Sequence, residues 1–162
     1  MTRHERLILS NQFAILEKVD PNQAEFYHQA QEILQYGYEA EYSRLWDYIS
    51  PDEFTRHQSE EVNNILEMFR SLADAYGTLE DKAGIEPHNI SFLGFDGNNE
   101  SDQMAYARFL RDELHAWESV LTRDLNSHHP TLDRYRQMLT RYTQSADRFH
   151  LTRGDIIRII AR

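Results

Sequence analysis

The sequence predicts an all-α protein: a single-domain helical bundle of about six to seven helices with a central apolar loop at residues 92–96. Apolar residues recur at the three- and four-residue spacing of helices through most of the chain. Several of these segments begin with a capping pattern, a serine or threonine followed three residues later by an acid. No stretch alternates apolar and polar residues for long, as a half-buried strand would. The length of 162 residues fits one domain, residues 1–162.

Three helices are expected within the first fifty residues. The first starts at the capping box Thr2-x-x-Glu5 and runs to about Lys18. Asp20-Pro21 supplies an N-cap and a first-turn proline for the second helix, which stops at Gly37. A short third helix is expected over residues 39–48, with its apolar side chains on one side.

The longest helix is expected next. Its start signal is Ser50-Pro51-Asp52-Glu53, which combines an N-cap, a proline and a capping glutamate, and its apolar stripe extends to Leu79. A break near residues 57–59 stays open, because the stripe lapses there. Residues 84–99 then form the longest predicted loop, with one proline and two glycines beyond its first residue.

Helix is expected again from about Glu100 past Leu114, whose side chain is predicted to point inward. A polar break at residues 126–130 precedes a helix that carries Tyr135. A short last helix is capped by Thr152-x-x-Asp155 and is rich in isoleucine.

The central loop lies between these helical regions. An apolar segment without helical period is poorly suited to water, and its glycine allows a turn or a close backbone approach. We expect Phe92, Leu93 and Phe95 to be buried between helices of both halves of the chain. Asp96 is expected to accept backbone N–H groups of the loop or of the next helix start, or to meet an arginine of the second half. The loop residues are Phe92, Leu93, Gly94, Phe95 and Asp96.

The net charge of −10 is unevenly distributed along the chain. Residues 1–81 carry 6 basic and 16 acidic side chains, residues 82–162 carry 11 of each, and residues 134–162 alone have a net charge of +5. Two interpretations stay open: the basic C-terminal segment docks on the acidic half, within one chain or between chains, or the charges lie on solvated helix faces. The acidity makes nucleic acid an unlikely partner, since nucleic-acid binding depends on neutralising phosphates.

The composition also restricts cellular setting and chemistry. There is no cysteine, which removes disulfides, thiolate metal sites and cysteine nucleophiles and fits a reducing cytoplasm. The N-terminal segment lacks the uninterrupted apolar region of a signal peptide, and no apolar run is long enough to span a membrane. We therefore expect a cytoplasmic protein without a membrane partner.

Several landmarks together resemble the YfbU family of small bacterial proteins, in the same order over nearly the whole chain. The specific parts are the heptad of residues 6–12 and the string of residues 92–96, whereas residues 38–62 and 97–130 match less clearly. The resemblance implies an all-helical cytoplasmic protein that self-associates, and it transfers no catalytic residues. The residues that carry it are Arg6-Leu7-Ile8-Leu9-Ser10-Asn11-Gln12, Asp20-Pro21, Glu67-Met68, Phe92-Leu93-Gly94-Phe95-Asp96, Tyr135, Met138-Leu139, His150-Leu151-Thr152, Ile156 and Ile160.

No metal or cofactor site is predicted. An acid precedes a histidine by three residues at Glu25/His28, Asp112/His115 and Asp147/His150, a pattern that di-iron bundles also use. Chance alone gives about one such pair, so surface pairs along a helix explain these better. Residues 96–107 place oxygen atoms like an EF-hand loop but lack its glycine and its bidentate glutamate.

One enzymatic alternative rests on Arg108 and His115. Six residues separate them, as in the Arg-x(4–6)-His pattern of HEPN-type helical ribonucleases, in which arginine would stabilise charge and histidine would act as general acid-base. The competing interpretation is an exposed helix face. We therefore favour a non-enzymatic interaction or regulatory protein, with the nuclease as the alternative.

Self-association into at least a dimer is expected from surplus apolar residues. Eight aromatic residues lie between positions 26 and 54 among acidic neighbours, which favours a protein partner over nucleic acid. The terminal isoleucines span more than one helix face and so need cover on several sides. The predicted interface residues are Tyr36, Tyr38, Tyr48, Ile156, Ile157 and Ile160.

Overall fold

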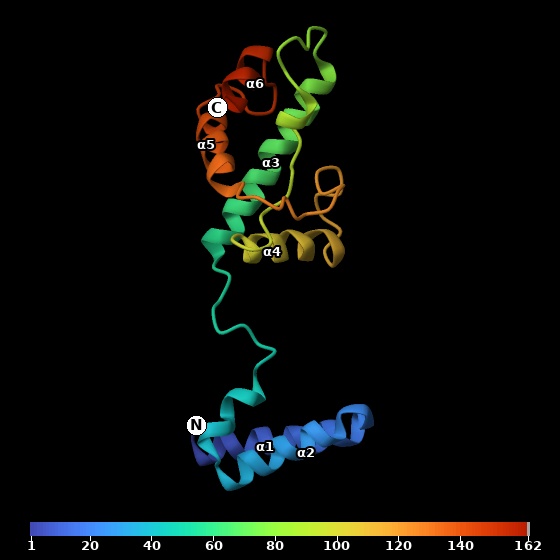
Figure 1. The fold of residues 1–162 in the computed structure, drawn as a ribbon, viewed down its shortest axis with the longest axis vertical. Helices are drawn as coiled ribbons and strands as arrows, with labels where there is room; N and C mark the ends of the chain where they lie inside the picture. The colour runs from blue at the N-terminus through green and yellow to red at the C-terminus, as the bar shows by residue number, and fades with distance from the viewer. Residues whose placement is uncertain (162) are drawn as a thin grey trace. The chain divides into compact units, whose positions relative to one another are not determined.

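The computed structural model describes residues 1–161 and is all-α (Figure 1). Six α-helices and three short 3-10 helices account for its regular structure, and no strand occurs within the described residues. The helices are α1 (Arg3–Val19), η1 (Pro21–Gln23), α2 (Ala24–Tyr36), η2 (Glu39–Leu45), α3 (Arg56–Thr78), η3 (Pro87–Asn89), α4 (Ser101–Asp112), α5 (Leu132–Thr143) and α6 (Arg153–Ile160).

The chain divides into two compact units, Met1–Glu53 and Phe54–Arg162, and each has its own hydrophobic core. We call them the N-terminal and the C-terminal unit and describe each by itself. By unit the net charge is −6 for residues 1–53, with four basic and ten acidic side chains, and −4 for residues 54–162, with 13 and 17. Charge is therefore shared between the units, unlike the division between the two halves of the sequence.

The N-terminal unit is a helical pair closed by η2. The capping box of Thr2 and Glu5 forms as predicted, and α2 ends at Gly37 in the left-handed conformation, with φ of 73°. Arg6 crosses from α1 and donates to Leu34 O over 3.0 Å, which satisfies a terminal carbonyl of α2. The positive φ favours glycine here, and a Cβ would also displace the flexible guanidinium of Arg6. The buried core is small: Phe13, Ala30, Leu34 and Leu45.

The C-terminal unit is built around α3. This 23-residue helix packs against α4, α5 and α6, and its residues between Val62 and Ala75 supply much of the unit's core. Arg136 of α5 pairs with Glu61 of α3 at 2.7 Å, and Arg153 of α6 pairs with Asp81 at 3.3 Å. Two arginines of the basic C-terminal segment thus pair with acids of residues 1–81 within the same chain, both at the surface.

Three boundaries differ from the sequence prediction. The helix expected from Ser50 begins at Arg56, because Thr55 forms a capping box with Gln58. It runs unbroken through residues 57–59, since its first turn lies beyond the core and needs no apolar stripe. The third helix is a 3-10 helix that ends at Leu45. The helix expected from Glu100 ends at Asp112, so Leu114 lies outside it and is 56% exposed.

Candidate functional site

Aromatic rings enclose the central loop in the core of the C-terminal unit. Phe92 and Phe95 are buried, and their ring centroids lie 5.5 and 5.9 Å from that of Tyr135 on α5. Phe69 of α3 meets Phe92 edge to face at 5.6 Å, whereas Leu93 is only half-buried. The loop therefore connects α3, from the first half of the sequence, with α5, from the second.

The hydroxyl of Tyr135 binds the backbone of the same loop. Leu93 N donates to Tyr135 Oη and Oη donates to Gly94 O, each over 3.1 Å. Burial raises the pKa of Tyr135 to about 12. Because Oη both accepts and donates a hydrogen bond within the core, the neutral phenol of Tyr135 has a structural role.

Gly94 permits the loop to run directly beside the segment that precedes α5. Its φ is 95°, and a Cβ there would lie 2.2 Å from Leu125 O. Phe95 N donates to Leu125 O over 2.9 Å, and Ser127 N donates to Phe95 O over 3.0 Å, which makes an isolated parallel bridge between Phe95 and Asn126. Only glycine fits this approach.

Asp96 is buried and fully engaged by its own loop. Its carboxylate accepts from Asn98 N at 3.1 Å and from the side-chain amide of Asn99. The Asn99 amide, followed by the Asn98 backbone, lowers the pKa of Asp96 below its ordinary value. The acid accepts backbone N–H in the loop, as the sequence suggests, and faces no empty cavity as a free carboxylate.

Glu100 organises the loop, and sequence reasoning missed this role. It is buried, and one oxygen accepts from Thr131 N and Leu132 N at 2.9 and 2.8 Å. The other accepts from Asp96 N at 2.9 Å and lies 3.0 Å from Thr131 Oγ1. The carboxylate therefore joins the start of α4 to the start of α5. In the sequence it looks like an ordinary acid at a helix start, because its partners lie 31 and 32 residues away.

Surface apolar residues concentrate in the N-terminal unit. Of the fifteen exposed large hydrophobic residues among residues 1–161, eleven belong to residues 1–53. On α1 they form what we call the α1 face, in which Leu7, Ile8, Ile15 and Val19 point away from Phe13 and Leu16 lies nearer to the side of Phe13. The α1 face comprises Leu7, Ile8, Ile15, Leu16 and Val19, with exposures of 59, 58, 63, 39 and 73%.

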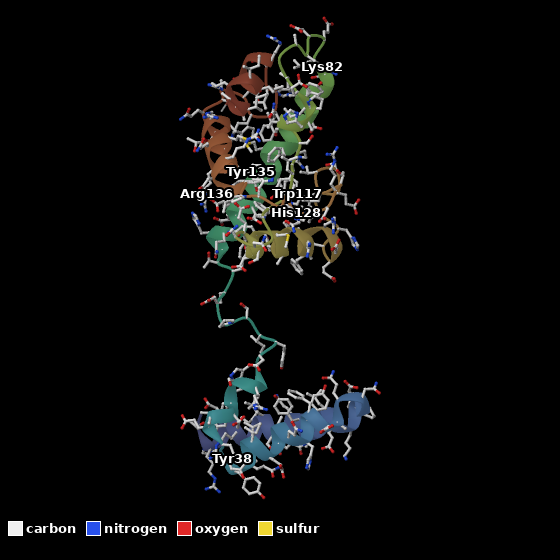
Figure 2. All side chains as sticks on the ribbon, viewed as in Figure 1. Tyr38, Lys82, Trp117, His128, Tyr135 and Arg136 are labelled. Carbon is white, nitrogen blue, oxygen red and sulfur yellow. The ribbon has the colours of Figure 1, made fainter. Side chains whose placement is uncertain are left out.

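Of the six predicted interface residues, Tyr36, Tyr38, Tyr48 and Ile157 are exposed, Ile157 at 38%, whereas Ile156 and Ile160 are buried. Tyr36 and Tyr38 are exposed and stack at 5.6 Å, Tyr38 extends away from the helices of its unit (Figure 2), and Tyr48 is 76% exposed. Ile156 and Ile160 are instead buried in the core of the C-terminal unit, where α3 and α5 cover them. Their own chain supplies the cover that the sequence left open, so they are unavailable as interface residues.

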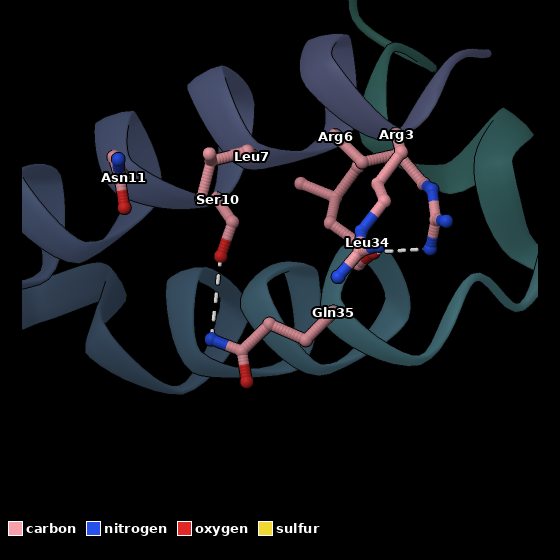
Figure 3. Close-up of a pocket in the computed structure, with 7 residues that line it drawn as sticks. All are labelled: Arg3, Arg6, Leu7, Ser10, Asn11, Leu34 and Gln35. Atoms are coloured by element: carbon pink, nitrogen blue, oxygen red, sulfur yellow. Dashed lines mark hydrogen bonds between the residues drawn. The ribbon is translucent and has the colours of Figure 1, made fainter.

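An open pocket of about 360 Å³ lies between α1 and α2 (Figure 3). Arg3 and Arg6 line one end, and Gln35 donates to Ser10 Oγ over 3.3 Å at the other. Leu7 of the α1 face also lines it. The pocket thus borders the α1 face with polar donors.

Arg108 and His115 do not form a protected catalytic pair. Arg108 lies on α4, but His115 follows the end of that helix with a φ of 50°. Both side chains are exposed, and both lower the pKa of Asp112 after the stronger effect of its hydrogen bond to Arg111. General acid-base chemistry benefits from a site that excludes water, and these residues lie in water.

Of the three acid–histidine pairs, Asp147/His150 forms a surface pair, whereas Glu25 bonds to Gln29 and Asp112 to Arg111. Asp147 and His150 are exposed and lie 2.8 Å apart, which lowers the pKa of Asp147. Across the part of the chain that the structure describes, no three His, Asp or Glu side chains are arranged to hold a metal ion.

A comparison with protein families decides the relationship. The family model described as YfbU domain matches residues 1–161 of the 162-residue chain. The chain belongs to the YfbU family. Both units therefore fall within one YfbU domain model, and the helical pair of α1 and α2 is part of that model.

The motifs that carry the YfbU resemblance have identifiable structural roles in this chain. The Phe-Leu-Gly-Phe-Asp string and Tyr135 form the aromatic centre of the C-terminal unit. Thr152 caps α6 and places Ile156 and Ile160 in the core. The heptad at residues 6–12 supplies Arg6, the pocket wall and the start of the α1 face. Within residues 1–161 of this YfbU domain, no helix is long and apolar enough to cross a membrane.

Proposed function

We propose that this YfbU protein acts as a non-enzymatic interaction protein that binds through its N-terminal unit. The observation that carries the proposal is the α1 face: five large apolar side chains on one helix, each at least 39% exposed. A helix that is apolar on two sides is normally covered on both. Contiguous exposed apolar surface on a soluble protein is typical of protein contact sites.

The size of the N-terminal unit supports the same proposal. Its 53 residues bury only four hydrophobic side chains fully, and a unit this small is marginally stable without further cover. The exposed tyrosines Tyr36, Tyr38 and Tyr48 add the residue type that interfaces favour. The cysteine-free sequence supports a cytoplasmic setting, and the acidic net charge supports a protein partner over nucleic acid.

The experiment is capture from cell lysate with a photo-crosslinker on the intact protein. The test variant is Ile8→Glu/Ile15→Glu, which puts charge on two residues that are 58 and 63% exposed. The matched control is Leu114→Glu/Phe149→Glu, which changes two residues of the C-terminal unit that are 56 and 70% exposed. We expect the wild type and the control to cross-link the same proteins, including a second copy of the chain, and the test variant to lose them.

Two results would contradict the proposal. Equal capture by all three proteins would mean that the α1 face binds nothing. Recovery of nucleic acid that disappears with Arg108→Ala/His115→Ala would favour the nuclease alternative.

A further inference from the structure

The α1 helix presents two apolar sides. Phe13 and Leu9 pack towards α2 in the core of the N-terminal unit. At 100° per residue, Ile15 and Ile8 point roughly opposite to Phe13, and Val19 follows Ile15 one turn later. Within the N-terminal unit nothing covers this second side, and Ile8, Ile15 and Val19 are 58, 63 and 73% exposed.

Resting on the interaction role proposed above, we propose that the partner at the α1 face is the α1 face of a second copy, in antiparallel orientation. The two-fold axis passes between Asn11 and Gln12, the midpoint of Ile8 and Ile15. Such an interface is self-complementary, because each residue is level with one whose number adds with its own to 23. Ile8 then meets Ile15 of the second copy, and two helical pairs complete a four-helix arrangement.

The charge distribution makes α1 the side of the unit at which two acidic copies repel each other least. The segment Arg3–Val19 carries three basic and two acidic side chains, a net +1, whereas residues 20–53 carry one basic and eight acidic side chains, a net −7. A second copy with the same −6 unit is repelled by every other side of the unit and least by this one. A nucleic acid or another polyanion would instead need a strongly basic surface, which this unit lacks.

Orientation follows from the ends of the helix. Both ends of α1 carry mixed charge: Glu5 lies in the first turn between Arg3 and Arg6, and Lys18 lies in the last turn beside Glu17. An antiparallel pair in this register places Lys18 of one copy level with Glu5 of the other and also aligns the helix dipoles favourably. A parallel pair would bring like ends together.

The polar residues at the centre fit the same arrangement. Asn11 and Gln12 flank the line of Ile8 and Ile15, and both are exposed. By the same sum, Asn11 is level with Gln12 of the second copy, and an amide both donates and accepts, so the two side chains can bond to each other. The centre of the interface therefore need not contain an unpaired polar group.

The test uses sedimentation of the full chain together with single-cysteine variants. Because the protein has no native cysteine, any disulfide must form through the introduced residue. At micromolar concentration we expect a species of twice 19.3 kDa. Ile8→Glu/Ile15→Glu should weaken the dimer roughly a hundredfold or more, because it buries unpaired charge at the contact. Leu114→Glu/Phe149→Glu should leave it unchanged. Circular dichroism confirms that the test variant is folded, and glutamate has the better helix propensity at both exposed positions.

Cross-linking tests the orientation. Helices pack about 8–10 Å apart, so Asn11→Cys should form a disulfide with its own copy. Ile8→Cys should not, because seven residues along a helix put the two cysteines about 10 Å apart. A mixture of Ile8→Cys and Ile15→Cys should form a disulfide between the two variants. The control variant Phe149→Cys should form no disulfide.

Three outcomes overturn the inference. These are a monomer at every concentration, a dimer that survives Ile8→Glu/Ile15→Glu, or self-cross-linking of Ile8→Cys in place of Asn11→Cys. A monomer whose lysate partners still depend on the α1 face would leave the proposed function intact and show that the partner is a different protein.

Discussion

Replacing the carboxylate of Glu100 should destabilise the C-terminal unit. The loss of unfolding free energy should increase with the number of buried N–H donors that are left without an acceptor. In Glu100→Ala the buried N–H groups of Asp96, Thr131 and Leu132 all lose their acceptor. Each unpaired buried donor costs about 1–3 kcal/mol, so we expect a loss of about 3–5 kcal/mol once water reaches part of the site. Glu100→Gln keeps one oxygen for Thr131 N and Leu132 N, and its amide can donate to Thr131 Oγ1. Only Asp96 N is then unpaired, which predicts about 1–3 kcal/mol.

The assay is urea unfolding followed by Trp117, which belongs to the C-terminal unit, in a Trp46→Phe background. Asp102→Asn is the matched control, because it also removes an acid at the start of α4 but an exposed one. The expected order of lost stability is Glu100→Ala, then Glu100→Gln, then Asp102→Asn. If Glu100→Gln and Asp102→Asn differed by less than about 0.5 kcal/mol, the carboxylate would not be the group that joins α4 to α5.

Three further predictions concern the loop and its contacts. Phe95→Ala should cost the C-terminal unit about 3–5 kcal/mol in urea unfolding, and an unchanged melting temperature would show that the loop does not join the two halves of the sequence. Gly94→Ala should destabilise, because its Cβ would lie 2.2 Å from Leu125 O, whereas Gly77→Ala within α3 meets nothing within 4 Å and should stabilise by up to about 1 kcal/mol; equal melting temperatures would refute the close approach. Because the pKa of Tyr135 is raised to about 12 in the folded state, its contribution is complete below about pH 10 and lost as pH rises towards 12; Tyr135→Phe should show a smaller loss of stability over this range in pH-dependent unfolding, and an identical slope would contradict the burial of the phenol.

The two units are suited to different tasks. In the C-terminal unit, aromatic residues and carboxylates belong to the core, and Asp96, Glu100 and Tyr135 all have hydrogen-bond partners there. The N-terminal unit keeps a small core and leaves most of its large apolar side chains at the surface. An interaction role of this YfbU protein is therefore best sought in the N-terminal unit.

The sequence by itself determined the fold class and those helix ends that depend on neighbouring residues. The capping boxes at Thr2 and Thr152 and the left-handed Gly37 involve residues at most four positions apart, so their patterns are legible without any tertiary contact. The apolar residues between positions 92 and 96 likewise predict burial, because exposing large aromatic side chains to water is unfavourable.

Tertiary structure decided what depends on distant partners. Two start signals compete at Ser50 and Thr55, and the helix takes the one nearer the segment that packs in the core. Glu100 became a buried acceptor because Thr131 and Leu132 lie beside it in space, and nothing near it in sequence reveals this. The apolar residues of α1 predict a helix but not which side is covered; packing of α2 against Phe13 made that choice and left Ile8 and Ile15 exposed. Burial is a property of the whole contact set, whereas capping is a property of a few adjacent residues.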